Sequence, residues 1–182
     1  MEKTLAHIAL FAALIAVLGI VPPLSLGFGV PITAQSLGIM LAGSVLGAKR
    51  GTAAVLLFLF IVTLGLPLLS GGRGGLGVFV GPTAGFLAGF VAAAFTIGLI
   101  VERWRGAPLA VVATVASLIG GIIVMYAFGI VGMAIVLDKT LVEAAWLVTA
   151  FIPGDIGKAV IAGLVTAALA RARPASMLSR AA

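Results

Sequence analysis

The sequence is poor in the residues on which most soluble proteins depend. It has no cysteine, which excludes disulfide bonds, thiolate metal sites and cysteine nucleophiles, and its single histidine, His7, excludes a metal site built from histidines. Only 9% of the residues are charged, whereas a soluble domain carries about 25%. Eleven basic and five acidic side chains are too few to cover a water-soluble globule of 182 residues. This scarcity excludes a cytosolic enzyme, a secreted disulfide scaffold and a disordered chain.

The residues that are abundant are apolar and form long runs. Hydrophobic residues make up 63% of the chain, and the mean hydropathy is +1.35. A membrane-spanning helix needs about 20 residues, so the chain has room for roughly six spans and none for a soluble domain. The runs are continuous, whereas a membrane β-barrel would alternate apolar and polar residues. The sequence therefore predicts an all-α integral membrane protein, with one domain over residues 1–182 that forms a six-transmembrane-helix bundle.

Prolines, glycines and charged residues interrupt the runs and indicate where the spans end. The expected spans are 5–20, 36–48, 52–66, 79–101, 108–137 and 153–170. Pro153 suits the first turn of the last helix, where its missing N–H is no loss. That helix would be about 27 Å long, close to the hydrocarbon thickness of about 30 Å. Residues 138–152 would then form an external segment.

The basic residues give the orientation, because lysine and arginine accumulate in short cytoplasmic loops. With six spans, eight of them fall at one set of helix ends: Lys3, Lys49, Arg50, Arg103, Arg105, Arg171, Arg173 and Arg180. The other ends carry only Arg73 and Lys139, and Lys158 lies inside the last helix. Both termini are therefore expected in the cytoplasm, with the loops at about 21–35, 67–78 and 130–152 outside. The net charge of +6 then reflects topology rather than nucleic-acid binding.

Two ionisable residues, Asp155 and Lys158, lie in the first turns of the last expected span. A charged group inside a span costs about 2.5–3.5 kcal/mol. Their spacing of three residues places them on one helix face, where opposite charges offset each other's desolvation. One interpretation is an ion pair that only holds helices together, or whose side chains extend to the outer membrane interface. We favour a ligand site that faces the bundle interior, because apolar residues would serve packing at lower cost.

A glycine-rich segment between two expected spans surrounds the only arginine outside the cytoplasmic ends. Gly71, Gly72, Gly74 and Gly75 flank Arg73, and glycine permits positive φ and close backbone approach. Such a loop can fold into the mouth of the bundle, where Arg73 could bind a carboxylate through two parallel hydrogen bonds. The alternative is a flexible external loop with a solvated arginine. The segment has no GxxxxGK[ST] pattern, which excludes a nucleotide-binding loop.

Several short motifs resemble those of a known family, the biotin-specific substrate-capture (S) component of energy-coupling-factor (ECF) transporters, or BioY family. The similar strings cover nearly the whole chain: PITAQ at 31–35, GAKRG at 47–51, LPLLSGGRGGLG at 66–77, GPTAGFLAGF at 81–90, YAFG at 126–129 and FIPGDIGK at 151–158. The family often has PTGGY where this chain has PTAGF, so the hydroxyl of that tyrosine is absent at Phe86.

The resemblance implies a protein of the bacterial cytoplasmic membrane that binds one biotin from outside, and that has no enzymatic activity or cofactor of its own. It implies partners, namely a transmembrane coupling (T) subunit and two cytosolic ATPases. Small residues of the first span would contact the coupling subunit; on this chain these are Ala9, Ala13 and Ala16. The implied biotin contacts are Asp155, Lys158, Gln35, Thr33, Tyr126, Arg73 and the surrounding glycines.

Two other functions stay open at this stage. The chain could be a structural or assembly protein of the membrane, in which the polar residues only hold helices together. It could also be a self-sufficient secondary vitamin transporter, although few titratable groups are available within its spans for ion coupling.

Overall fold

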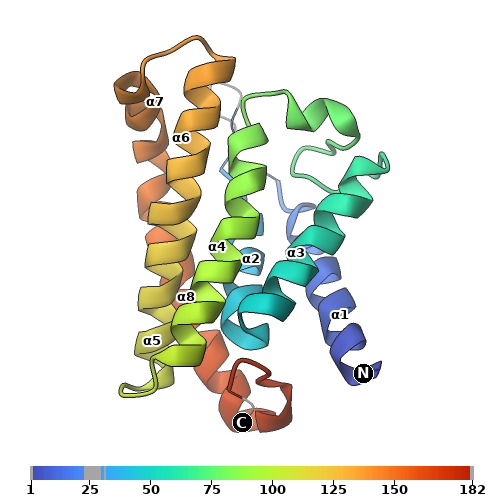
Figure 1. Ribbon diagram of the computed structural model, residues 1–182, viewed down its shortest axis with the longest axis vertical. Helices are drawn as coiled ribbons and strands as arrows, with labels where there is room; N and C mark the ends of the chain where they lie inside the picture. The colour runs from blue at the N-terminus through green and yellow to red at the C-terminus, as the bar shows by residue number, and fades with distance from the viewer. Residues whose placement is uncertain (1, 23–29, 31, 181–182) are drawn as a thin grey trace.

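The computed structural model describes residues 2–22, 30 and 32–180, and within these ranges the chain is a helical bundle (Figure 1). Its helices are α1 (Glu2–Leu18), α2 (Gln35–Leu46), α3 (Ala48–Thr63), α4 (Ala84–Arg103), α5 (Leu109–Leu118), α6 (Met125–Val136), α7 (Leu141–Val148) and α8 (Ile152–Ala172). An isolated bridge joins Leu69 and Arg73. The expectation of an all-α protein is therefore confirmed for the part of the chain that the structure describes.

Three helical stretches are long and apolar enough to cross a membrane: Ala84–Arg103, Leu109–Val136 and Leu141–Ala172. The second of them contains α5 and α6, joined without a break by a π-helical stretch at Ile119–Val124. π-Helical turns are frequent at functional sites, and this one ends directly before Met125 and Tyr126. Both chain termini lie at the same end of the bundle, away from the loop between α3 and α4 (Figure 1).

The boundaries of three elements differ from the sequence-based prediction. The third helix begins at Ala48 rather than at residue 52, because Gly47, at φ 86°, ends α2 and the Ala48 N–H donates a 2.9 Å hydrogen bond to Glu102. The fourth begins at Ala84 rather than at residue 79, because Leu76–Phe79 forms a separate 3-10 turn. The segment 138–152 contains helix α7 and a short 3-10 turn that leads directly into α8. Pro153 lies in the first turn of α8, as predicted.

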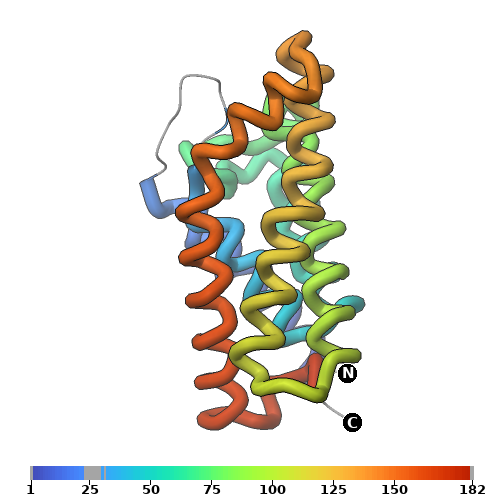
Figure 2. Tube along the Cα trace, turned by 90° about the vertical axis from the view of Figure 1, so that its left-hand side faces the viewer, coloured from blue at the N-terminus to red at the C-terminus, as the bar shows by residue number. Residues whose placement is uncertain are grey.

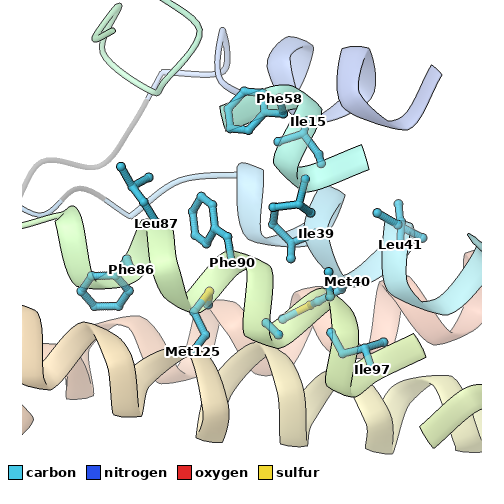
Figure 3. Close-up of a cluster of buried hydrophobic side chains, with 14 of the residues drawn as sticks. Ile15, Ile39, Met40, Leu41, Phe58, Phe86, Leu87, Phe90, Ile97 and Met125 are labelled. Atoms are coloured by element: carbon cyan, nitrogen blue, oxygen red, sulfur yellow. The ribbon is translucent and has the colours of Figure 1, made fainter. Parts of the chain in front are cut away.

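Helix α2 is the centre of the bundle. All of its residues except Leu37 are buried, and it packs on α1, α3, α4 and α8. Lipid is as apolar as leucine, so close van der Waals packing holds such helices together. Figure 3 shows Ile39 and Met40 of α2 among side chains of α4 and α6. Where α4 crosses the end of α2, a side chain at Gly98 would collide with the Ala48 backbone, so only glycine permits this crossing. A buried central helix places its first turn inside the bundle mouth.

Candidate functional site

A cavity opens among the first turns of α2, α4 and α8, at the end of the bundle away from both termini (Figure 1). Its volume is about 560 Å³ when the open mouth is included. The lining residues are Val30, Ile32, Thr33, Gln35, Ser36, Leu69, Arg73, Thr83, Phe86, Leu87, Phe90, Met125, Tyr126, Phe151, Asp155 and Lys158. Six of these residues were selected from the sequence, and they come from four separate segments of the chain. They are Thr33, Gln35, Arg73, Tyr126, Asp155 and Lys158. A mainly apolar wall with a few convergent polar groups is typical of small-molecule sites.

Asp155 is the centre of the polar part of the cavity. Its side chain is buried, with 4% of the residue exposed. Oδ1 accepts hydrogen bonds from Lys158 Nζ at 2.8 Å and Ser36 Oγ at 3.0 Å, and Oδ2 accepts one from the Tyr126 hydroxyl at 2.6 Å. Hydrogen bonds to an ionised carboxylate are the shortest and strongest that neutral donors make. The carboxylate is therefore held in one orientation by groups from α2, α6 and α8.

Lys158 has a complete set of acceptors inside the cavity. Besides Asp155, its ammonium donates to the Thr33 carbonyl at 2.6 Å and to Ser36 Oγ at 3.0 Å. An ammonium has three donors, and these three contacts use all of them. The side chain lies inward, as the spacing of Asp155 and Lys158 predicted, with 18% of it exposed. The pair is pre-ordered, so a ligand meets fixed charges rather than mobile ones.

Three aromatic rings form the apolar wall beside this pair. The centroids of Phe86, Tyr126 and Phe151 are 6.1–6.3 Å apart, and every pair of rings meets edge to face. Edge-to-face contacts are favourable because the positive edge of one ring meets the negative face of the next. The sequence selected Tyr126 but missed the two phenylalanines, since ten phenylalanines in an apolar chain carry no signal of which ones share a wall.

Arg73 brings a second positive charge to the cavity from the glycine-rich loop. Its main chain pairs with Leu69 in both directions, at 2.9 and 3.1 Å, across a turn in which Gly71 and Gly72 have φ of 79° and 70°. Nε donates to the Ser70 carbonyl and Nη1 to Thr83 Oγ1. Burial lowers the pKa of the Arg73 guanidinium, which nevertheless stays charged. With Lys158 and Asp155, the lining carries a formal charge of +1, which favours an anionic ligand.

The glycines around Arg73 lie outside the lining of the cavity. Gly71, Gly72, Gly74 and Gly75 do not line the cavity; three of them have positive φ, and they shape the turn that carries Arg73. The backbone N–H groups of Leu69, Arg73 and Gly75 donate to carbonyls of the protein itself, so these groups do not serve a ligand. Pro31 of the PITAQ motif lies outside the described residues.

Gln35 lines the cavity, but its side-chain amide forms hydrogen bonds with backbone groups of the protein itself. Nε2 donates to the carbonyls of Ile15 and Leu68, each at 3.1 Å, and Oε1 accepts from the Ser70 N–H at 3.0 Å. The side chain is almost fully buried, at 2% exposure. Gln35 thereby joins α1, α2 and the loop of Arg73. Thr33 is used similarly: its hydroxyl accepts from the Gln35 N–H, and its carbonyl accepts from Lys158.

We expect Gln35→Met to weaken ligand binding about tenfold, although the methionine side chain is similar in size to that of glutamine. Methionine leaves two carbonyls and the Ser70 N–H without partners, and each unsatisfied buried group costs about 1–3 kcal/mol. The Arg73 loop then loses its anchor. The measurement is ligand affinity together with melting temperature in detergent. Leu37→Met is the matched control, because it places methionine in the same helix without removing a hydrogen bond; equal losses in both variants would contradict the anchoring role.

The three alanines of the first helix face away from the cavity. Ala9 and Ala13 are exposed, whereas Ala16 is half-buried and packs against the hydrophobic core. Within the described residues, no group of three or more His, Asp or Glu could hold a metal ion.

Comparison with known proteins gives one consistent result. A family model described as "BioY family" matches residues 2–175. The biotin transporter BioY of Rhodobacter capsulatus is 54% identical over 99% of this chain and 100% of its own length, and that of Rhizobium etli is 53% identical over 90% of each. A crystal structure of the S-component for biotin from an ECF-type ABC transporter superposes with a TM-score of 0.89, at 32% identity, covering 93% of this chain and 92% of that one.

Proposed function

The chain belongs to the BioY family, and we propose that it captures biotin as the substrate-specific component of an ATP-driven ECF transporter. The observation that carries the proposal is the cavity that joins the buried Asp155–Lys158 pair, Arg73 and an aromatic wall. A full-length relative that is 54% identical and is called a biotin transporter supports biotin as the substrate.

The chemistry of biotin is complementary to this cavity. Its ureido group has two N–H donors and a carbonyl acceptor, its fused rings and chain are apolar, and its carboxylate is negative. The Asp155 carboxylate accepts a ureido N–H, beside the Tyr126 hydroxyl. Lys158 and Arg73 are the two cations in the lining, where their positive charges attract the carboxylate and the ureido oxygen. The rings pack on the aromatic wall, Thr33 lines the polar end, and the loop with Gly71, Gly72, Gly74 and Gly75 covers the site.

The topology proposed for this function has six spans in the bacterial cytoplasmic membrane. The spans are α1, α2, α3, α4, the continuous α5–α6 helix and α8, packed as a single domain over residues 1–182. Both termini are placed in the cytoplasm, because the end of the bundle that carries them also carries eight of the eleven lysines and arginines. The biotin cavity then opens to the outside.

Energy for uptake has to come from other subunits, because the sequence contains no GxxxxGK[ST] loop. We assign it to a transmembrane coupling subunit and two cytosolic ATPases. The exposed face of α1 with Ala9, Ala13 and Ala16 is the proposed contact with the coupling subunit, because small residues let helices approach closely in lipid.

The direct test is mass spectrometry of the small molecule that co-purifies with the protein, followed by thermal melting with and without biotin. We expect biotin to be released on denaturation and to raise the melting temperature of the stripped protein. A protein that carries no small molecule and melts at the same temperature with biotin would instead be a structural membrane protein. Biotin uptake that collapses with the membrane potential at constant ATP would indicate a secondary transporter.

A further inference from the structure

The C-terminal segment 173–180 folds back across the end of the bundle that carries the termini. Figure 2 shows the chain turning beneath the bundle after α8. The Ser179 N–H donates to the Val45 carbonyl at 2.9 Å, and Ser179 Oγ donates to the Ser44 carbonyl at 2.6 Å. Met177 and Ser179 are buried. The segment is therefore a fixed part of this end, and residues 176–180 lie beyond the part that the family model matches.

Three arginines surround this segment, and each donates to a backbone carbonyl. Arg50 Nη1 donates to Leu178 at 3.1 Å, Arg180 Nη2 to Trp104 at 3.0 Å, and Arg105 Nε to Glu102 at 3.2 Å. Within the described residues, the one ion pair of the protein is Asp155–Lys158, so no carboxylate is paired with any of the three arginines. The Glu102 carboxylate, which lies at the same end, accepts a hydrogen bond from the Ala48 N–H rather than from an arginine.

Arg180 and Arg105 bring their positive charges to the same short stretch of chain. Arg180 donates to the carbonyl of Trp104 and Arg105 to that of Glu102, so both guanidinium groups lie at the end of α4. Burial and the nearby charge of Arg105 lower the pKa of the Arg180 guanidinium. Two guanidinium groups that repel each other and have unused donors fit a phosphate, which guanidinium binds through two parallel hydrogen bonds.

An apolar groove starts at Arg180. It is lined by Ala170, Pro174, Ala175, Met177 and Arg180, so one cation lies among four apolar residues. The groove lies at the C-terminal end of α8. In the proposed topology this end meets the membrane surface, where anionic headgroups attract basic residues. A free phosphate would use only the cation, whereas a phospholipid uses the cation and the apolar wall together.

We propose that this groove binds an anionic phospholipid, with its phosphate on Arg180 and Arg105 and an acyl chain along Ala175 and Met177. The ligand class follows from the charge and shape of this end of the molecule and is independent of the biotin cavity. Its role is to fasten the folded-back C-terminal segment to the membrane surface.

The experiment measures lipid binding by native mass spectrometry and by melting temperature in neutral detergent. Phosphatidylglycerol is expected to bind and to raise the melting temperature, whereas phosphatidylcholine and inorganic phosphate are not. A basic residue near an anionic surface is worth about fivefold in affinity. Arg180→Gln should therefore lower phosphatidylglycerol binding about fivefold, and Arg105→Gln by a similar factor.

Arg103→Gln is the matched control, since it removes one exposed positive charge at the same helix end, but Arg103, unlike Arg105, is not a charge that acts on Arg180; it should bind phosphatidylglycerol like the unmodified protein. Biotin affinity measured in parallel shows that each variant is folded. Equal binding of both lipids, an unchanged affinity in both Arg180→Gln and Arg105→Gln, or stabilisation by inorganic phosphate alone would overturn the proposal. So would normal lipid binding by Arg180→Gln combined with failure to assemble with the coupling subunit, which would make this end a protein interface.

Discussion

Asp155→Asn is expected to weaken biotin binding at least about 100-fold while the bundle stays folded. Each hydrogen bond to a charged group contributes about 1.5–3 kcal/mol, and about 2.7 kcal/mol corresponds to 100-fold in affinity. Asparagine keeps the shape of the side chain but removes the charge that Lys158, Ser36 and Tyr126 surround at 2.6–3.0 Å. It also replaces one acceptor oxygen by a donor that would face the ureido N–H groups.

Binding is measured by calorimetry on biotin-free protein, with the melting temperature as a check of folding. Asp138→Asn is the matched control: it makes the same chemical change on an exposed residue outside the cavity, and Asp138 has φ 51°, which asparagine readily adopts. Tyr126→Phe removes one neutral donor but keeps the carboxylate, so its loss should be about tenfold. Full biotin affinity in Asp155→Asn would refute the role of this carboxylate.

The placement of charged side chains was the feature that the sequence predicted best, because burying a charge in lipid is costly and leaves few positions for it. The spacing of Asp155 and Lys158 predicts that they share one helix face, and their cost in lipid favours the bundle interior; in the structure both line the cavity. Helix boundaries were less predictable, because α2 and α3 are separated by one glycine in a continuous apolar stretch. The positive φ of Gly47 and its approach to Glu102 end the helix there, whereas Lys49 and Arg50, which suggested a loop, lie within the first turn of α3.

The candidate site was predictable in its polar half and not in its apolar half. Polar residues are rare in this chain, so Gln35, Tyr126 and Arg73 stood out, and all of them line the cavity. Phe86 and Phe151 both lie in motifs that the sequence singled out, but nothing in the sequence shows that their rings meet, and only the folded arrangement brings them together. The role of Gln35 could not be predicted from the sequence either, because a side-chain amide can form hydrogen bonds with a ligand or with the backbone equally well. Its three bonds to the protein show that here it positions the Arg73 loop.

Removing the positive member of the buried pair should have the largest effect on stability. Lys158→Met is expected to lower the free energy of unfolding by about 2–3 kcal/mol, somewhat below the 3–5 kcal/mol typical of a broken buried pair, because part of this side chain is exposed. The uncompensated charge of Asp155 is the cause. Lys139→Met, an exposed lysine at the same end of the bundle, should change stability little.

The double variant Asp155→Asn with Lys158→Met separates the two interpretations of the pair. With both charges gone, no uncompensated charge remains, and asparagine still meets Ser36 and Tyr126, so most of the lost stability should return. Biotin binding should stay absent, because neither charge is available to the ligand. Both quantities are measured by titrating unfolding in detergent with and without biotin. A pair kept only to hold helices together would instead leave the biotin affinity of the double variant like that of the unmodified protein, since neither charge would touch the ligand.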